Sequence, residues 1–256
     1  YDVRFPNLYR ELAKKGALIV LNGRSSERLS EAEIQLKSIH PQVIAVCTDV
    51  STIEGCQLLI TETISAFGKI DILINNVGVS MRGNVADLNP EVFKTVFESN
   101  VLGTVYPTIP AIPYLRETKG SIVFISSLAG IRGLPGLSAY SSSKMALRAI
   151  AESIRIEEAK HNIHVGIILV GITDIEHTKE TISADGSMRL IASRKDKKVQ
   201  STEEVAKVVL KNIERRKYKS VLTPLGKLNA YLQARFPLLV ERIILSNLDK
   251  FEEGNK

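Results

Sequence analysis

The chain has 256 residues, 44% of them apolar, which suits a single α/β domain with a substantial buried core. Its net charge of +6 is spread without a basic stripe interleaved with aromatic residues, which argues against a nucleic-acid-binding protein. The four histidines show no metal-ligand spacing, and no apolar run approaches the roughly 20 residues that a membrane-spanning helix requires.

The first predicted elements are an amphipathic helix from Leu8 that ends at Gly16 and a buried strand over residues 17–22. Because the chain begins with Tyr1 rather than Met, we expect its natural start to be missing or processed. Helices 26–38 and 52–67 then alternate with strands 43–50 and 69–75. The two cysteines form no CxxC pair, which favours a reducing compartment such as the cytoplasm.

The next helix is predicted to open at Asn89, with Pro90 in its first turn. It contains Asn100, an unfavourable residue for a helix interior. Three prolines then predict a kink or a stop in the stretch that leads to residue 115: Pro107, Pro110 and Pro113.

Residues 121–144 predict a buried strand, a Gly/Pro loop and a helix that begins near Ser138. Tyr140 and Lys144 lie four residues apart on one helix face, and Ser127 leaves the strand at the edge where parallel sheets usually carry chemistry. A cation favours the phenolate form of a neighbouring tyrosine, which makes it a usable general acid and base. A serine hydroxyl can orient a substrate oxygen beside it. The alternative is an ordinary surface pair of Tyr and Lys.

After this helix we expect a strand over residues 164–170 and a polar segment, 176–200, that covers substrate as a mobile lid. Ser201 and Glu204 form a capping-box pattern for the next helix, and residues 218–224 predict an edge strand.

Residues 1–225 are assigned to one domain and residues 226–256 to an amphipathic helical tail. The tail has apolar residues at helical spacing, interrupted by Pro237, with Lys227, Arg235 and Arg242 between them. It either packs on the body or on a second subunit, or lies on a membrane surface as a basic amphipathic helix. The second interpretation would place the protein peripherally on a membrane and favour an apolar substrate.

Five motifs follow one another in a fixed order: TDVS at 48–51, ILINNVG at 72–78, ESNVLG at 98–103, ISS at 125–127 and YSSSK at 140–144. In order and spacing the chain resembles the short-chain dehydrogenase/reductase family over about residues 7–225. The resemblance implies an α/β fold, a Rossmann-like doubly wound parallel sheet in three α/β/α layers. It also implies an NAD(P)-dependent enzyme that passes hydride between nicotinamide and a carbonyl or secondary alcohol.

The resemblance assigns four catalytic residues. Tyr140 would be the general acid in reduction, Lys144 would support it and hold the nicotinamide ribose, and Ser127 would orient the substrate oxygen. Asn100 would interrupt the helical hydrogen bonding and support a proton relay.

The resemblance also assigns the residues that bind the cofactor. Those implied are Arg24, Asp49, Val50, Asn76, Val77, Gly78, Tyr140, Lys144, Gly171, Ile172 and Thr173. Strand 17–22 is followed by Gly23 rather than an acid, and by a guanidinium suited to a 2′-phosphate, so NADP(H) is expected over NAD(H). The alternative is that Arg24 only begins the polar turn into helix 26–38, which has its own capping pattern.

Two departures separate the chain from the family pattern. Residues 1–7, YDVRFPN, stand where the family has a first strand and a glycine-rich turn, T-G-x-x-x-G-I-G, which are missing here. Val170 and Ile175 replace the family's proline and threonine near the nicotinamide, and Thr173 is the proposed substitute for the missing hydroxyl. The alternative function is therefore a non-catalytic or truncated protein of this fold that acts as a binding partner. The family's habit is a homo-dimer or homo-tetramer through helices 90–117 and 139–160.

Overall fold

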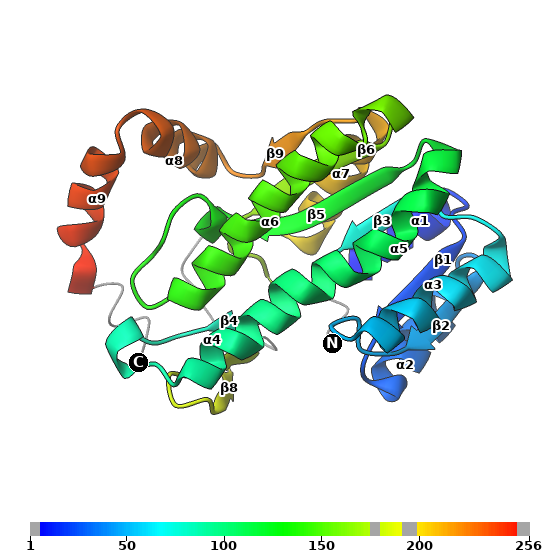
Figure 1. Ribbon diagram of the computed structural model, residues 1–256, viewed down its shortest axis with the longest axis horizontal. Coiled ribbons are helices and arrows are strands. Elements are labelled where there is room, and N and C mark those ends of the chain that lie inside the picture. The colour runs from blue at the N-terminus through cyan, green and yellow to red at the C-terminus, as the bar shows by residue number, and fades with distance from the viewer. Residues whose placement is uncertain (1–5, 175–179, 191–198, 250–256) are drawn as a thin grey trace.

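The computed structural model describes residues 6–174, 180–190 and 199–249, and Figure 1 shows parallel strands between two layers of helices. The main sheet has four parallel strands in the order β3 (Ile72–Asn75), β5 (Ser121–Ser127), β6 (His164–Val170) and β9 (Lys219–Val221). This arrangement confirms the predicted Rossmann-like α/β class. The edge strand after residue 217 is also confirmed.

Two smaller sheets complete the strands. One is the parallel pair β1 (Ile19–Gly23) and β2 (Val43–Cys47). The other joins β4 (Ser80–Met81) in parallel to β7 (Glu180–Ile182), which pairs antiparallel with β8 (Met188–Leu190). The predicted lid, 176–200, therefore contains a hairpin in its described part, while residues 175–179 and 191–198 lie outside the described residues.

Helices cover both faces of the main sheet, and others pack on the β1–β2 pair or extend to one side. The described helices are α1 (Pro6–Lys14), α2 (Ser26–Lys37), α3 (Ile53–Phe67), α4 (Pro90–Phe97), α5 (Gly103–Thr118), α6 (Ser138–Glu157), α7 (Thr202–Glu214), α8 (Pro224–Arg235) and α9 (Pro237–Leu245). Short 3₁₀ turns lie at η1 (Val85–Asp87), η3 (Leu128–Gly130) and η4 (Ala159–His161), and a π-turn, η2 (Glu98–Leu102), joins α4 to α5. None of these helices is both long and apolar enough to cross a bilayer, within the described part of the chain.

The alternation of side chains along β5 explains the three layers. Val123 and Ile125 point into a core with α1 and α7, whereas Ile122 and Phe124 point into a core with α5 and α6. All four side chains are buried, because parallel strands covered on both faces carry continuous apolar runs.

The strands are not one continuous sheet. No ladder hydrogen bond joins β1 to β3 in the described ranges, so the β1-β2 pair and the four-stranded sheet are separate. Ile72 of β3 is 38% exposed, while every residue of β6 is buried. Residues 1–5, which cover most of the segment where the family's first strand was expected, lie outside the described residues.

Most local signals act as predicted. Asn89 caps α4, with Pro90 in the first turn, and Ser201 forms a capping box with Glu204 on α7. The stop predicted from the three prolines is wrong, because α5 continues through all of them to Thr118. Packing of its buried face, which includes Ala111 and Leu115, offsets the roughly 3 kcal/mol that an interior proline costs.

Candidate active site

The centre of the candidate site lies where β5 ends and α6 begins. Ser127 is the last residue of β5, and its Oγ accepts a hydrogen bond of 3.2 Å from the amide of Ala129, which caps η3. The loop after η3 leads to α6, whose first turn carries Tyr140. Strand, loop and helix thus follow the pattern predicted for residues 121–144.

Lys144 is held in the interior one turn after Tyr140. Its side chain is buried, and Nζ donates a hydrogen bond of 3.2 Å to the carbonyl oxygen of Ile125 on β5. Burying an ammonium group is costly unless it is hydrogen-bonded. The surface-pair alternative for Tyr140 and Lys144 is therefore wrong, because Lys144 points into the fold.

Asn100 is fully buried in the π-turn between α4 and α5. Its Oδ1 accepts from the amide of Val79 at 2.6 Å, and its Nδ2 donates to the Val79 carbonyl at 3.0 Å and to Ser143 Oγ at 2.9 Å. The predicted interruption of helical hydrogen bonding at Asn100 is confirmed. Its amide links the segment after β3 to α6.

Gly78 brings these groups together. A Cβ at this position would lie 2.8 Å from Asn100 Oδ1 and 3.1 Å from Lys144 Nζ, and the backbone φ of +157° is one that L side chains rarely adopt. Only glycine fits here, because the backbone passes directly over both side chains. Gly78, Asn100 and Lys144 are therefore adjacent, with Tyr140 on the same helix as the lysine.

Ser143 is a member of this cluster that sequence reasoning missed. It is buried, accepts from Asn100 Nδ2, and donates to the Tyr140 carbonyl at 2.8 Å. The signal was present, since Ser143 lies three residues after Tyr140 and thus on the same face of the helix.

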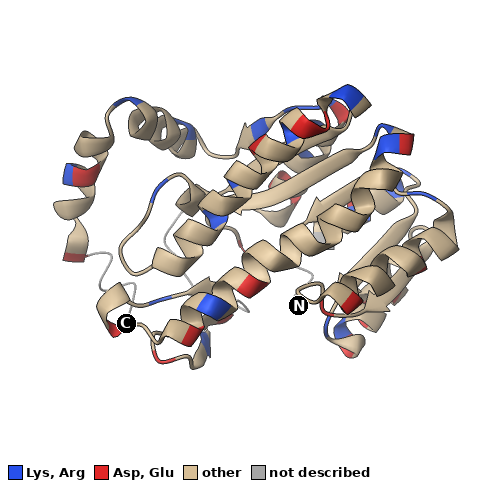
Figure 2. Cartoon of the chain, in the orientation of Figure 1, with Lys and Arg blue, Asp and Glu red and all other residues tan. Residues whose placement is uncertain are grey.

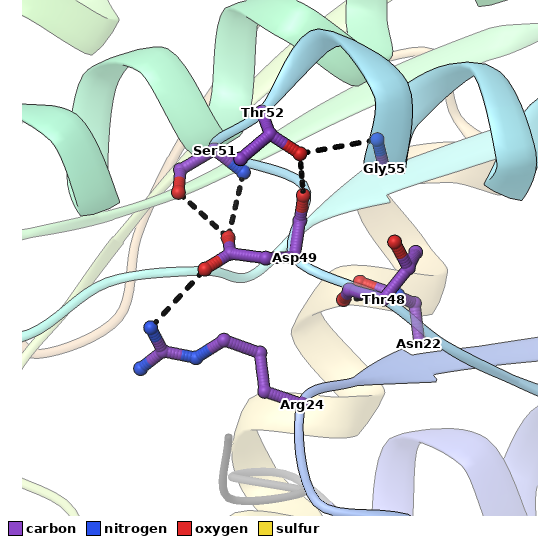
Figure 3. A network of polar contacts seen from close by, with 7 residues as sticks. All are labelled: Asn22, Arg24, Thr48, Asp49, Ser51, Thr52 and Gly55. Atoms are coloured by element: carbon purple, nitrogen blue, oxygen red, sulfur yellow. Dashed lines mark hydrogen bonds and ion pairs between the residues drawn. The ribbon is translucent and has the colours of Figure 1, made fainter.

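A second polar group lies at the carboxyl ends of β1 and β2 (Figure 3). Asp49 Oδ1 accepts from the amide and the hydroxyl of Ser51 at 2.9 and 2.6 Å, while its Oδ2 lies 3.3 Å from Arg24 Nη1. Burial works to raise the pKa of Asp49, but the bonds from Ser51 and the charge of Arg24 outweigh it and hold the pKa below its usual value. Thr52 caps α3, and Val50 is buried.

Arg24 is thus already near a carboxylate. Both side chains of the pair are well exposed, and exposed pairs of this kind contribute only ~0–1 kcal/mol. The guanidinium can leave such a pair at little cost when a stronger anion is present.

Asn76 and Val77 lie between β3 and Gly78 in the chain. Asn76 forms a side-chain hydrogen bond with Tyr9 of α1, whose pKa is raised by burial and partly lowered again by this bond. Val77 packs on the start of α5, because a Cβ at Gly103 would lie 3.3 Å from Val77 Cγ1. Both residues are half-buried.

The segment after β6 is held by Gln200. Its side-chain oxygen accepts a hydrogen bond from the backbone amide of Gly171 at 3.3 Å, and its own backbone amide donates to the Ile172 carbonyl at 2.9 Å. Thr173 is buried and forms an isolated bridge with Gln200, whereas Ile172 is partly exposed. Ile175 lies outside the described residues.

The described residues contain no group of three His, Cys, Asp or Glu side chains placed to hold a metal ion.

Comparison with known proteins identifies relatives over most of the chain. Residues 7–186 match the family described as short chain dehydrogenase. Dehydrogenase/reductase SDR family member 7B of Bos taurus is 33% identical over 246 residues, covering 92% of this chain and 75% of the relative. The 3-ketodihydrosphingosine reductase of Bos taurus is 34% identical, covering 79% of this chain. The 11-beta-hydroxysteroid dehydrogenase 1A of Arabidopsis thaliana is 36% identical, covering 74%. The chain spans 62% and 55% of the lengths of the last two.

Two solved structures share the fold. A short chain dehydrogenase/reductase from Burkholderia phymatum in complex with NAD aligns with a TM-score of 0.78 at 21% identity, covering 91% of this chain and 89% of that chain. An alcohol dehydrogenase from Thermococcus sibiricus complexed with 5-hydroxy-NADP aligns with a TM-score of 0.73 at 23% identity, covering 84% and 89%. At these identities the likeness concerns the fold alone.

Proposed function

The chain belongs to the short-chain dehydrogenase family, and from this premise we propose that it is an NADP-dependent oxidoreductase. It would interconvert a carbonyl and a secondary alcohol. The observation that carries the proposal is the buried cluster of Lys144, Asn100 and Gly78 beside Tyr140. Burying the Lys144 ammonium one helix turn from a tyrosine is costly, and charged groups buried in this way cluster at functional sites.

Each residue of the cluster has a role in this proposal. Tyr140 gives a proton to the substrate oxygen during reduction, and Ser127 holds that oxygen by a hydrogen bond. The Lys144 ammonium stabilises the phenolate that forms on Tyr140. Asn100 acts through position, because it fixes the Val79 backbone and Ser143 around the lysine.

The described residues fit a nicotinamide nucleotide, which would supply or accept the hydride. Lys144 and Tyr140 would bind its ribose, and the close backbone approach at Gly78 leaves no Cβ in the way. The backbone of Asn76 and Val77, with Asp49 and Val50, would line the adenosine side. Gly171, Ile172 and Thr173 would contact the carboxamide.

Preference for NADP(H) over NAD(H) is part of the proposal. Arg24 is half exposed and pairs with Asp49 at 3.3 Å, and an exposed pair of this kind is weak enough for the guanidinium to turn to a 2′-phosphate. Hydrogen bonds to charged groups contribute about 1.5–3 kcal/mol, which corresponds to roughly 10- to 150-fold in affinity. Arg24→Ala should therefore weaken NADPH by about that factor and leave NADH nearly unchanged. Arg28→Ala, in the first turn of α2, is the matched control.

Relatives named for ketodihydrosphingosine and 11-beta-hydroxysteroid support an apolar substrate. We further propose a cytoplasmic homo-dimer or homo-tetramer that uses α4, α5 and α6, the helices expected from the family's habit. Sedimentation velocity of the purified chain measures the assembly directly.

A second candidate is a protein of this fold that binds a partner without turnover. It is favoured by one observation: within the described residues no ladder hydrogen bond joins β1, which leads to the Arg24–Asp49 group, to β3, which leads to Asn76. In the first proposal a nucleotide would contact the residues after β1 and those after β3 at the same time. The second proposal requires no nucleotide, so nucleotide binding distinguishes the two candidates.

The deciding experiment is a titration with NADPH and with NADH, followed by nucleotide fluorescence. Saturable binding with NADPH preferred, followed by oxidation of NADPH with apolar ketones, supports the enzyme. Tyr140→Phe should retain binding and lose turnover, since it removes only the proton-transferring hydroxyl. No binding of either nucleotide would rule out the enzyme and favour the binding protein.

A further inference from the structure

Helix α8 presents large apolar side chains to solvent. Within it Gly226 is buried, and Asn229, Ala230, Leu232 and Gln233 are half-buried. Its exposed residues include Leu225, Leu228 and Tyr231, exposed to 75%, 51% and 59%. A surface helix normally presents the opposite arrangement, because apolar area in contact with water is unfavourable.

Helix α9 continues the same surface. Val240 is its one buried side chain, whereas the outward positions carry four exposed apolar residues: Leu238, Leu239, Ile243 and Leu245. We call α8 and α9 together the arm, residues 224–245. Figure 1 shows the arm extending to one side of the sheet, away from the α2–β2 side of the molecule. Contiguous apolar patches of this kind mark binding surfaces.

The charges of the arm identify the chemistry of its partner. Three exposed cations, Lys227, Arg235 and Arg242, lie among the apolar side chains. The acidic residue of the arm, Glu241, already pairs with Arg132 at 3.5 Å. Figure 2 shows the arm otherwise largely without charge. The arm therefore presents an apolar surface with a positive excess, which suits an anionic and apolar partner.

The arm is anchored beside the candidate active site. Gly226 packs so closely on Leu128, the residue after Ser127, that a Cβ there would lie 2.7 Å from Leu128 Cδ2. Arg132, in the loop between Ser127 and Tyr140, donates to Gln233 Oε1 at 3.1 Å and to the Pro237 carbonyl at 3.3 Å. These contacts fix both helices to the loop that precedes Tyr140.

We propose that the arm docks the protein on the surface of a lipid bilayer that contains anionic lipid. Helices with this composition bury their apolar side chains at the boundary of headgroups and acyl chains while cations reach the headgroups. A second copy fits less well, because a two-fold contact through this face would bring like cations close together without free acidic partners.

Docking would also serve the reaction. Resting on the proposed function, the arm would hold the loop from Ser127 to Tyr140 against the bilayer, so that an apolar carbonyl compound passes from lipid into the site without crossing water. The bilayer that the arm binds would then also supply the substrate.

The test is co-sedimentation of the full chain with vesicles of phosphatidylcholine, with and without about 30% phosphatidylserine. We expect binding to the anionic vesicles. Lys227→Gln, Arg235→Gln and Arg242→Gln together should weaken it about a hundredfold, since each cation near such a surface contributes roughly fivefold. A second variant, Leu228→Ser with Tyr231→Ser and Ile243→Ser, should abolish binding to the anionic vesicles.

The matched control changes exposed apolar residues elsewhere, Ile34→Ser on α2 and Ile156→Ser on α6, and should bind vesicles like the unchanged chain. If the unchanged chain bound neither kind of vesicle, the proposal would be overturned. So would a dimer in sedimentation velocity that the serine variants of the arm dissociate, since a second copy would then cover the surface. NADPH binding in solution is measured in parallel, so failure of the proposed function is recognised separately from failure of docking.

Discussion

Replacement of Asn100 by alanine tests the construction of the candidate site. The change removes three hydrogen bonds and leaves the amide and the carbonyl of Val79 without the partners that hold them. A buried group that loses its partner costs about 1–3 kcal/mol, and the bond to Ser143 contributes about 1 kcal/mol more. Allowing for partial access of water to Val79, we expect a total loss of about 3 kcal/mol in the free energy of unfolding.

The assay is thermal unfolding followed by circular dichroism. For a domain of this size, 1 kcal/mol shifts the midpoint by roughly 2–4 °C, so Asn100→Ala should lower it by about 6–12 °C. Ser143→Ala is the control, because it removes one of the three bonds. It also removes the donation to the Tyr140 carbonyl, but that carbonyl keeps its partner within the α-helix, so the variant should cost about 2–4 °C. If Asn100→Ala lowered the midpoint no more than Ser143→Ala, the amide would not be the link between η2, Val79 and α6 that we describe.

Three further predictions concern single residues elsewhere in the fold. Burial, together with the charge of Asp49, raises the pKa of Cys56 to about 11, so iodoacetamide at pH 8 should modify exposed Cys47 and spare Cys56 until the chain is unfolded. Burial lowers the pKa of His164, so the unfolded chain binds its proton first and the urea midpoint should fall as pH decreases from about 7 to 5.5. His164→Gln should make that fall shallower, and an unchanged slope would refute the assignment. Gly78→Ala should lower stability and nucleotide affinity together, whereas Gly133→Ala, with nothing within 4 Å of the added Cβ, should change neither.

The parts of the site that could be predicted from sequence are those encoded locally. The sequence of strand, loop and helix around Ser127 and Tyr140 depends on nearby residues, and so does the cap at Asn89. The course of α5 through its prolines was not predictable in this way, because the packing that offsets their cost comes from other elements.

Long-range contacts account for the rest. The pairing of Arg24 with Asp49 joins residues 25 positions apart, and the bridge of Thr173 to Gln200 joins segments that no local pattern connects. The exposure of Leu225, Leu228 and Tyr231 on α8 also required coordinates, because the periodicity of the apolar residues is the same whichever way the helix is turned.

Among the residues that the structure describes, no backbone ladder joins β1 to β3, and this has a consequence for how these strands unfold. Backbone ladders bind β1 to β2 and β3 to β5, while Leu8 and Tyr9 of α1 reach the other side through side chains alone. Segments held by fewer backbone bonds open as separate cooperative units, so amides of β1 and β2 should exchange with solvent before those of β5 and β6. A nucleotide that contacts Arg24 and Lys144 at once would bridge the two units and protect both from exchange together.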